Sequence, residues 1–64
     1  MTTKEEKTAA LQNAIDTGNE YGEISWDGLL DLCDEDMVLG RYLIKELKKM
    51  KDLNKINFDI SEIV

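Results

Sequence analysis

Few side chains in this 64-residue sequence could carry out a reaction. It contains no histidine and one cysteine, Cys33, and the serines Ser25 and Ser61 have no evident base beside them. A nucleophilic serine or cysteine is activated by a neighbouring base, most often histidine. We therefore expect neither enzymatic activity nor a cofactor. Free cysteine is among the most buried residue types, so we expect Cys33 in the core, with a redox role as the alternative.

Four acids gather in the middle of the chain, at positions 31, 34, 35 and 36. Carboxylates can hold hard cations, but these acids lack the alternating Asp-x-Asp-x-Asp-Gly pattern of a calcium-binding loop. A structural zinc site is disfavoured as well, because the chain offers one cysteine and no histidine. Helix capping and solubility explain the acids better, and we expect no metal site.

Cations gather in the second half of the chain. Residues 41–55 carry a net charge of +4, which leaves −10 on the remainder of a chain whose total is −6. Arg41, Lys45 and Lys48 follow one another at intervals of four and three residues, so a helix would place them on one side, with Lys49 beside them. Such a ridge suits phosphates or an acidic protein surface. The alternative is that these cations only complement the dipole of their helix.

Aromatic residues supply one further candidate. Trp26 follows an apolar helical spacing, so we expect it in the core, whereas Tyr21 lies in a stretch flanked by glycines and is the better candidate for contact with a partner. The candidate binding residues are therefore Tyr21, Arg41, Lys45, Lys48 and Lys49.

Two helices are expected to carry most of these residues. The longer covers residues 34–52, where apolar residues recur at intervals of three and four. Acids at its start and lysines at its end complement the helix dipole. The other covers residues 4–17, with Thr3 and Glu6 at capping-box spacing and Gly18 as its terminator.

Shorter elements are expected to complete the fold. Residues 18–22 contain two glycines and an asparagine and are predicted to form a loop. Ser25 can cap a short helix over residues 26–33. Residues 56–60 alternate polar and apolar side chains like a strand with one buried face, and Ile24 is the candidate for its neighbour. The fold class expected is mainly α, with three helices and a short two-stranded sheet. The residues expected to be buried together are Leu11, Ile15, Trp26, Leu30, Leu43, Leu47 and Phe58.

This order of elements resembles the winged-helix family, a variant of the helix-turn-helix, over residues 23–60. The resemblance rests on Ile24 as first strand, on Ser25-Trp26-Asp27 opening the second helix, on Leu43, Ile44 and Leu47 in the third, and on Ile56, Phe58 and Ile60 in the returning strand. It implies DNA binding by the third helix. Two departures stand against that function: the chain stops where another wing strand usually follows, and Asp34, Glu35 and Asp36 open the third helix.

Length and composition favour a single small cytoplasmic domain spanning residues 1–64. No apolar run approaches the roughly 20 residues that span a bilayer, and the first residues lack the apolar core of a signal peptide. Domains this small are marginally stable, and self-association as a homodimer is one way to stabilise them. We expect a non-enzymatic regulatory or adaptor domain that binds a protein, of a kind that would suit a phage or mobile-element inhibitor of a host factor. A winged-helix DNA-binding regulator using the basic ridge is the alternative.

Overall fold

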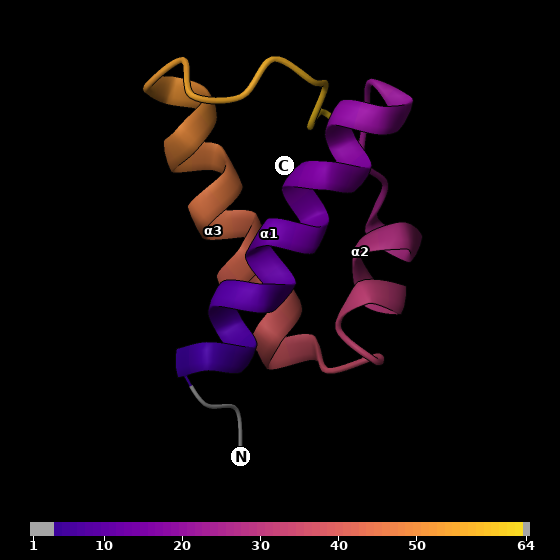
Figure 1. Ribbon diagram of the computed structural model, residues 1–64. Coiled ribbons are helices and arrows are strands. Elements are labelled where there is room, and N and C mark those ends of the chain that lie inside the picture. Colours follow the sequence, from indigo (N-terminus) through magenta and orange to yellow (C-terminus); the bar gives the residue numbers. More distant parts are fainter. Residues whose placement is uncertain (1–3, 64) are drawn as a thin grey trace.

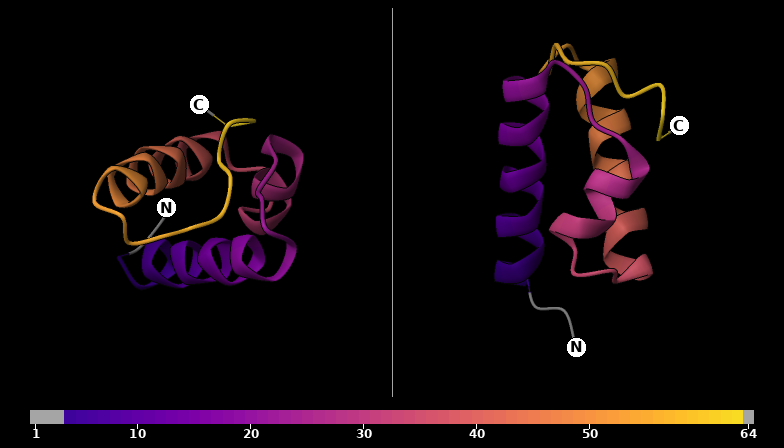
Figure 2. Two further views of the ribbon diagram at one scale, coloured as in Figure 1. Left: turned by 90° about the horizontal axis from the view of Figure 1, so that it is seen from above. Right: turned by 90° about the vertical axis from the view of Figure 1, so that its right-hand side faces the viewer.

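Three helices account for most of the chain. The computed structural model describes residues 4–63, which form α1 (Lys4–Tyr21), α2 (Trp26–Leu32) and α3 (Met37–Asp52). Each helix contacts the other two, so together they enclose one core (Figure 1). Residues 53–63 leave the end of α3 and cross the end of the bundle where α1 finishes (Figure 2). The expectation of a mainly α fold is confirmed.

The core contains fewer of the large apolar residues than their helical spacing predicted. Leu43, Leu47 and Phe58 are buried as expected. The other four residues expected there are only half-buried: Leu11, Ile15, Trp26 and Leu30. In α1 the buried positions are instead the small residues Ala10, Ala14 and Gly18. Small side chains let α1 approach its neighbours closely, which leaves its larger apolar residues at the margin of the core.

α1 is longer than predicted because Gly18 does not end it. The helix continues to Tyr21, and the residue with the left-handed backbone is Gly22, whose φ is +77° and whose N–H donates to the Gly18 carbonyl over 2.8 Å. The predicted loop at residues 18–22 is therefore wrong. Gly18 serves packing: a β-carbon there would lie 2.5 Å from atoms of the Phe58 ring. Thr3, expected to cap this helix, lies outside the described residues.

The turn between α2 and α3 also differs from the prediction. Ser25 caps α2 as expected, since its Oγ accepts the Gly28 N–H over 3.1 Å. The cap of α3 is Asp36, whose Oδ1 accepts two backbone N–H groups of the first turn. The prediction that α3 starts at residue 34 is wrong, because Asp34 and Glu35 adopt positive φ angles of 54° and 62°.

Asp34 instead helps to close α2. Its N–H donates to the Asp31 carbonyl over 3.2 Å, and the next N–H, from Glu35, reaches back to the Leu30 carbonyl over 2.8 Å. This pair of bonds is the Schellman arrangement, which requires a left-handed residue after the helix. Aspartate tolerates that conformation better than most non-glycine residues. The result is a four-residue connection, residues 33–36, between α2 and α3.

The expected two-stranded sheet is absent from residues 4–63, and this part of the predicted fold class is wrong. A single parallel bridge joins Glu23 to Asp59. Its two bonds run from Ile24 N–H to the Asp59 carbonyl, 3.1 Å, and from Asp59 N–H to the Gly22 carbonyl, 3.0 Å. Pairing cannot extend, because α1 ends and α2 begins within a few residues of the bridge. The alternation of residues 56–60 is real, since Ile56, Phe58 and Ile60 are buried, but it belongs to an irregular segment.

Candidate protein-binding surface on α2 and α3

Exposed cations follow one side of α3. Arg41, Lys45, Lys48 and Lys49 are all exposed. Because successive residues of a helix are turned by about 100°, Arg41, Lys45 and Lys48 lie within a quarter-turn of one another, and Lys49 follows beyond Lys45. Lys45, Lys48 and Lys49 line one shallow hollow of about 400 Å³. The structure therefore brings together the four predicted basic residues, which we call the basic edge.

An apolar strip separates α3 from α2. It contains Gly40, which is buried, and the half-buried Trp26 and Leu30. A β-carbon at Gly40 would lie 3.4 Å from the Trp26 Cη2 atom and 3.4 Å from the Leu30 Cδ2 atom, so both side chains reach across to α3. Met37 and Ile44 lie one turn before and after Gly40, on the same flank of α3. Met37 is 48% exposed. The strip is thus an apolar seam that side chains only partly cover.

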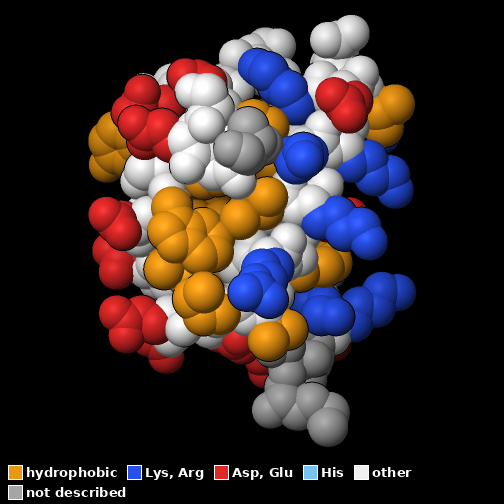
Figure 3. All heavy atoms as spheres, turned by 180° about the vertical axis from the view of Figure 1, so that it is seen from behind, with side chains coloured by type: hydrophobic (Ala, Val, Ile, Leu, Met, Phe, Trp, Pro, Cys, Tyr) orange, Lys and Arg blue, Asp and Glu red, His pale blue; other side chains and the backbone are white. Residues whose placement is uncertain are grey.

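Acids border the other side of the apolar strip. Asp27 and Asp31 are exposed and lie four residues apart on α2, so they form a row. On a helical wheel this row follows Trp26 and Leu30 on the side away from the core. We call it the acidic edge. Figure 3 shows the arrangement: hydrophobic side chains occupy the middle of this face, with Asp and Glu on the α2 side and Lys and Arg on the α3 side. We call the whole surface the α2/α3 face.

The remaining predicted binding residue does not join the basic edge. Tyr21 is the last residue of α1 and is 71% exposed, so it is available for contact but belongs to a different helix. Another aromatic residue, Tyr42, connects α3 to α1, because the Lys7 ammonium lies 5.1 Å from the centre of its ring. That distance is within the range of a cation–π interaction. Tyr42 is therefore part of the packing between helices.

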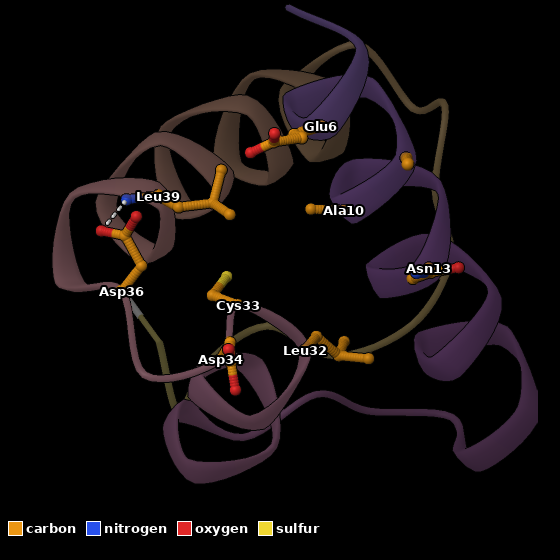
Figure 4. Close-up of a pocket in the computed structure, with 9 residues that line it drawn as sticks. Glu6, Ala10, Asn13, Leu32, Cys33, Asp34, Asp36 and Leu39 are labelled. Atoms are coloured by element: carbon orange, nitrogen blue, oxygen red, sulfur yellow. Dashed lines mark hydrogen bonds between the residues drawn. The ribbon is translucent and has the colours of Figure 1, made fainter. Parts of the chain in front are cut away.

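The single thiol lies beside a hollow between α1 and the connection at residues 33–36. In Figure 4 the Cys33 sulfur points toward Ala10 and Leu39. The hollow has a volume of about 490 Å³, and Glu6, Asp34 and Asp36 are among the residues that line it. Cys33 itself is buried, and burial, reinforced by the charge of Asp36, raises the pKa of its thiol.

These surroundings make Cys33 a poor nucleophile. The thiolate is the reactive form of cysteine, and a raised pKa lowers its population at neutral pH. Among residues 4–63 no group of three or more His, Cys, Asp or Glu side chains is arranged to hold a metal ion.

The sequence alone did not predict that the acidic edge and the apolar strip belong to one surface. The signal is present in the spacing of Trp26 and Leu30 beside Asp27 and Asp31, but that spacing alone is equally typical of a helix with one buried face and one solvent face. Only the packing of Trp26 and Leu30 against Gly40 shows that these two rows of α2 lie beside α3.

Comparison of the chain with protein-family models, curated proteins and solved structures found no match. Of the helices in the described part of the chain, none combines the length and the apolar character needed to cross a membrane.

Proposed function

We propose that this chain is a non-enzymatic regulatory or adaptor domain that binds another protein through the α2/α3 face. The observation that carries the proposal is the layout of this face, an apolar strip between a basic edge and an acidic edge (Figure 3). Protein interfaces have this anatomy, with an apolar centre surrounded by a polar rim. Tryptophan and arginine, here Trp26 and Arg41, are the residue types enriched at their energetic centres.

The charges of the face favour a partner that also carries both signs. The basic edge would meet acidic side chains and the acidic edge basic ones, which orients the partner and accelerates encounter. We place the protein in the cytoplasm, where a lone buried thiol such as Cys33 stays reduced. A small acidic chain of this kind suits an inhibitor of a host factor, encoded by a phage or mobile element.

The proposal is tested by affinity capture from a lysate of the source cell, with and without nuclease. The bait variants are the wild type, Arg41→Glu with Lys45→Glu, and a control, Lys4→Glu with Lys55→Glu. Both double variants change the net charge equally, and Lys4 and Lys55 are exposed outside the α2/α3 face. We expect a protein that survives nuclease treatment and is lost only with the basic-edge variant. Capture that is equal for all three baits would contradict the proposal.

A winged-helix DNA-binding regulator is the second candidate, and two observations favour it. The connection of four residues between α2 and α3 has the length found in helix-turn-helix units, and the basic edge follows it on α3. Against it, Asp34, Glu35 and Asp36 immediately precede α3, where base-reading residues would approach the groove. The total charge of −6 also opposes approach to DNA.

A mobility-shift titration with duplex DNA separates the two functions. Changing Arg41, Lys45 and Lys48 to Glu should abolish any DNA binding, and each lost phosphate contact should reduce the slope of log affinity against log salt by nearly one unit. We expect only weak, nonspecific binding by the wild type at physiological salt. Tight, sequence-selective binding that the triple variant loses would favour the second candidate over the first.

A further inference from the structure

The α2/α3 face has opposite charges on its two sides, and this layout has a geometric consequence. The acidic edge, Asp27 and Asp31, lies on α2, and the basic edge, led by Arg41 and Lys45, lies on α3. The apolar strip between them runs along the seam of the two helices (Figure 3). Consider a second copy laid on this face by a twofold rotation about an axis parallel to the seam. The rotation exchanges left and right, so the basic edge of each copy faces the acidic edge of the other.

From this we infer that a second copy of this chain covers the α2/α3 face in a symmetric homodimer. The inference rests on the proposed function, because it assigns an occupant to the same face. A twofold interface is self-complementary and needs the same patch on both subunits. An apolar strip lying along the axis meets its own copy, and the half-buried Trp26 and Leu30 then lose their remaining contact with water. If the face carried charges of one sign only, like charges would face each other across the twofold axis.

The size of the molecule limits the strength of such a dimer. Its extents are 30 × 21 × 19 Å, so its largest face offers about 600 Å² per copy. Two such faces together amount to about 1,200 Å², which is the lower end of the range for specific interfaces. The net charge of −6 per copy adds repulsion at long range. At about 0.15 M salt, charges beyond about 8 Å are screened, and the close pairs across the interface remain. We therefore expect a dimer with a dissociation constant in the micromolar range.

Sedimentation velocity over a range of concentrations tests the dimer directly. Trp26 is the only tryptophan, so its fluorescence reports on this face alone. We expect wild-type protein to shift from monomer to dimer with increasing concentration at about 0.15 M salt, with a blue shift of the emission over the same range. A wild-type chain that stays monomeric up to millimolar concentration would overturn the inference.

Charge-swap variants make the test specific for the orientation of the two copies. Arg41→Glu with Lys45→Glu removes the net positive charge of the basic edge and places two acids opposite the acidic edge of the other copy, whereas Asp27→Lys with Asp31→Lys makes both edges basic. Each variant alone should dimerise at least about tenfold more weakly than the wild type, because like charges then face each other. An equimolar mixture of the two should restore association as a heterodimer, since an acidic face then meets a basic one. A mixture that remains monomeric would overturn the inference.

Controls separate a lost interface from a lost fold. Lys4→Glu with Lys55→Glu changes the charge as much as the basic-edge variant does and should leave the dimer intact. Asp27 lies in the first turn of α2, where an acid stabilises the helix, so Asp31→Lys mixed with Lys45→Glu provides a milder pair. Circular dichroism of each variant confirms its helices.

If the chain is monomeric but the basic-edge variant still loses a captured protein, the dimer is wrong and the proposed function stands. If neither association is found, both are wrong.

Discussion

Replacing either of two buried glycines by alanine is predicted to change the free energy of unfolding, in opposite directions at the two positions. Gly18 lies in α1 and Gly40 in α3, and both are buried. In either helix, alanine is favoured over glycine by about 0.5–1 kcal/mol, because glycine loses more backbone freedom on folding. The surroundings differ. A β-carbon at Gly18 would lie 2.5 Å from three atoms of the Phe58 ring, whereas one at Gly40 would touch Trp26 and Leu30 at 3.4 Å, an ordinary contact.

The magnitudes follow from these distances. Overpacking of a closed core costs about 1–3 kcal/mol, and the Phe58 ring is itself buried, so it cannot swing into solvent. We expect Gly18→Ala to lower the free energy of unfolding by about 1–2 kcal/mol after the gain in helix propensity. Gly40→Ala should raise it by about 0.5–1 kcal/mol. In a domain of this size, 1 kcal/mol corresponds to roughly 4–8 °C in Tm, so the two variants should melt on opposite sides of the wild type.

Thermal and urea unfolding followed by circular dichroism measure both effects. Ala9→Gly, at an exposed position of α1, calibrates the helix-propensity term without a packing change. A double-mutant cycle of Gly18→Ala with Phe58→Ala isolates the clash, because removing the ring should make the alanine at position 18 favourable. A Gly18→Ala variant as stable as the wild type, or a cycle without coupling, would refute the packing of Phe58 on α1.

Three further predictions concern the core, the thiol and one carboxylate. Leu47→Ala should lower the free energy of unfolding by about 2–5 kcal/mol, since Leu47 is fully buried, and a melt within a few degrees of wild type would contradict this. Cys33 should react slowly with iodoacetamide in the folded state and rapidly in urea, because burial raises the pKa of its thiol; equal rates would show that the site is open. The Asp59 pKa is lowered, first by the Ser61 backbone N–H and then by the Ser61 hydroxyl, so its bonds stabilise the fold above the ordinary aspartate pKa and are lost as pH falls through the lowered value. Ser61→Ala should raise the Asp59 pKa in an NMR titration, and an unchanged value would exclude the hydroxyl as a cause.

Local patterns in the sequence predicted the three helices and some of their ends, such as Asp52 at the end of α3, but not the end of α1 or the start of α3. The apolar spacing identified all three helices, and Ser25 was recognised as a cap because that role depends only on neighbouring residues. The ends were misplaced where two residues could play the same part. Gly18 and Gly22 both suit a helix terminator, but Gly22 adopts the left-handed backbone that ends α1, whereas Gly18 stays helical and leaves room for Phe58, which is far away in the sequence.

Long-range pairing was harder to predict for the same reason. The alternation of residues 56–60 correctly indicated one buried face, but a strand also needs a partner with free backbone groups along several residues. Gly22 to Ile24 offer room for one bridge only. Lys51 also competes for this segment, since its ammonium donates to the Phe58 carbonyl over 2.8 Å. Neither fact could be read from the local pattern.

The basic edge could be predicted because one helix carries it, whereas the α2/α3 face depends on how two helices meet. That meeting is set by residues 33–36, in which Asp34 and Glu35 adopt left-handed backbone conformations and Asp36 caps α3. The three acids are therefore tied to the geometry of the turn. They also bring three carboxylates to the beginning of α3, where a DNA-binding helix would approach the groove. The same residues that align Trp26 with α3 thus make that end of the helix unfavourable for phosphate, which is a physical reason to favour a protein partner.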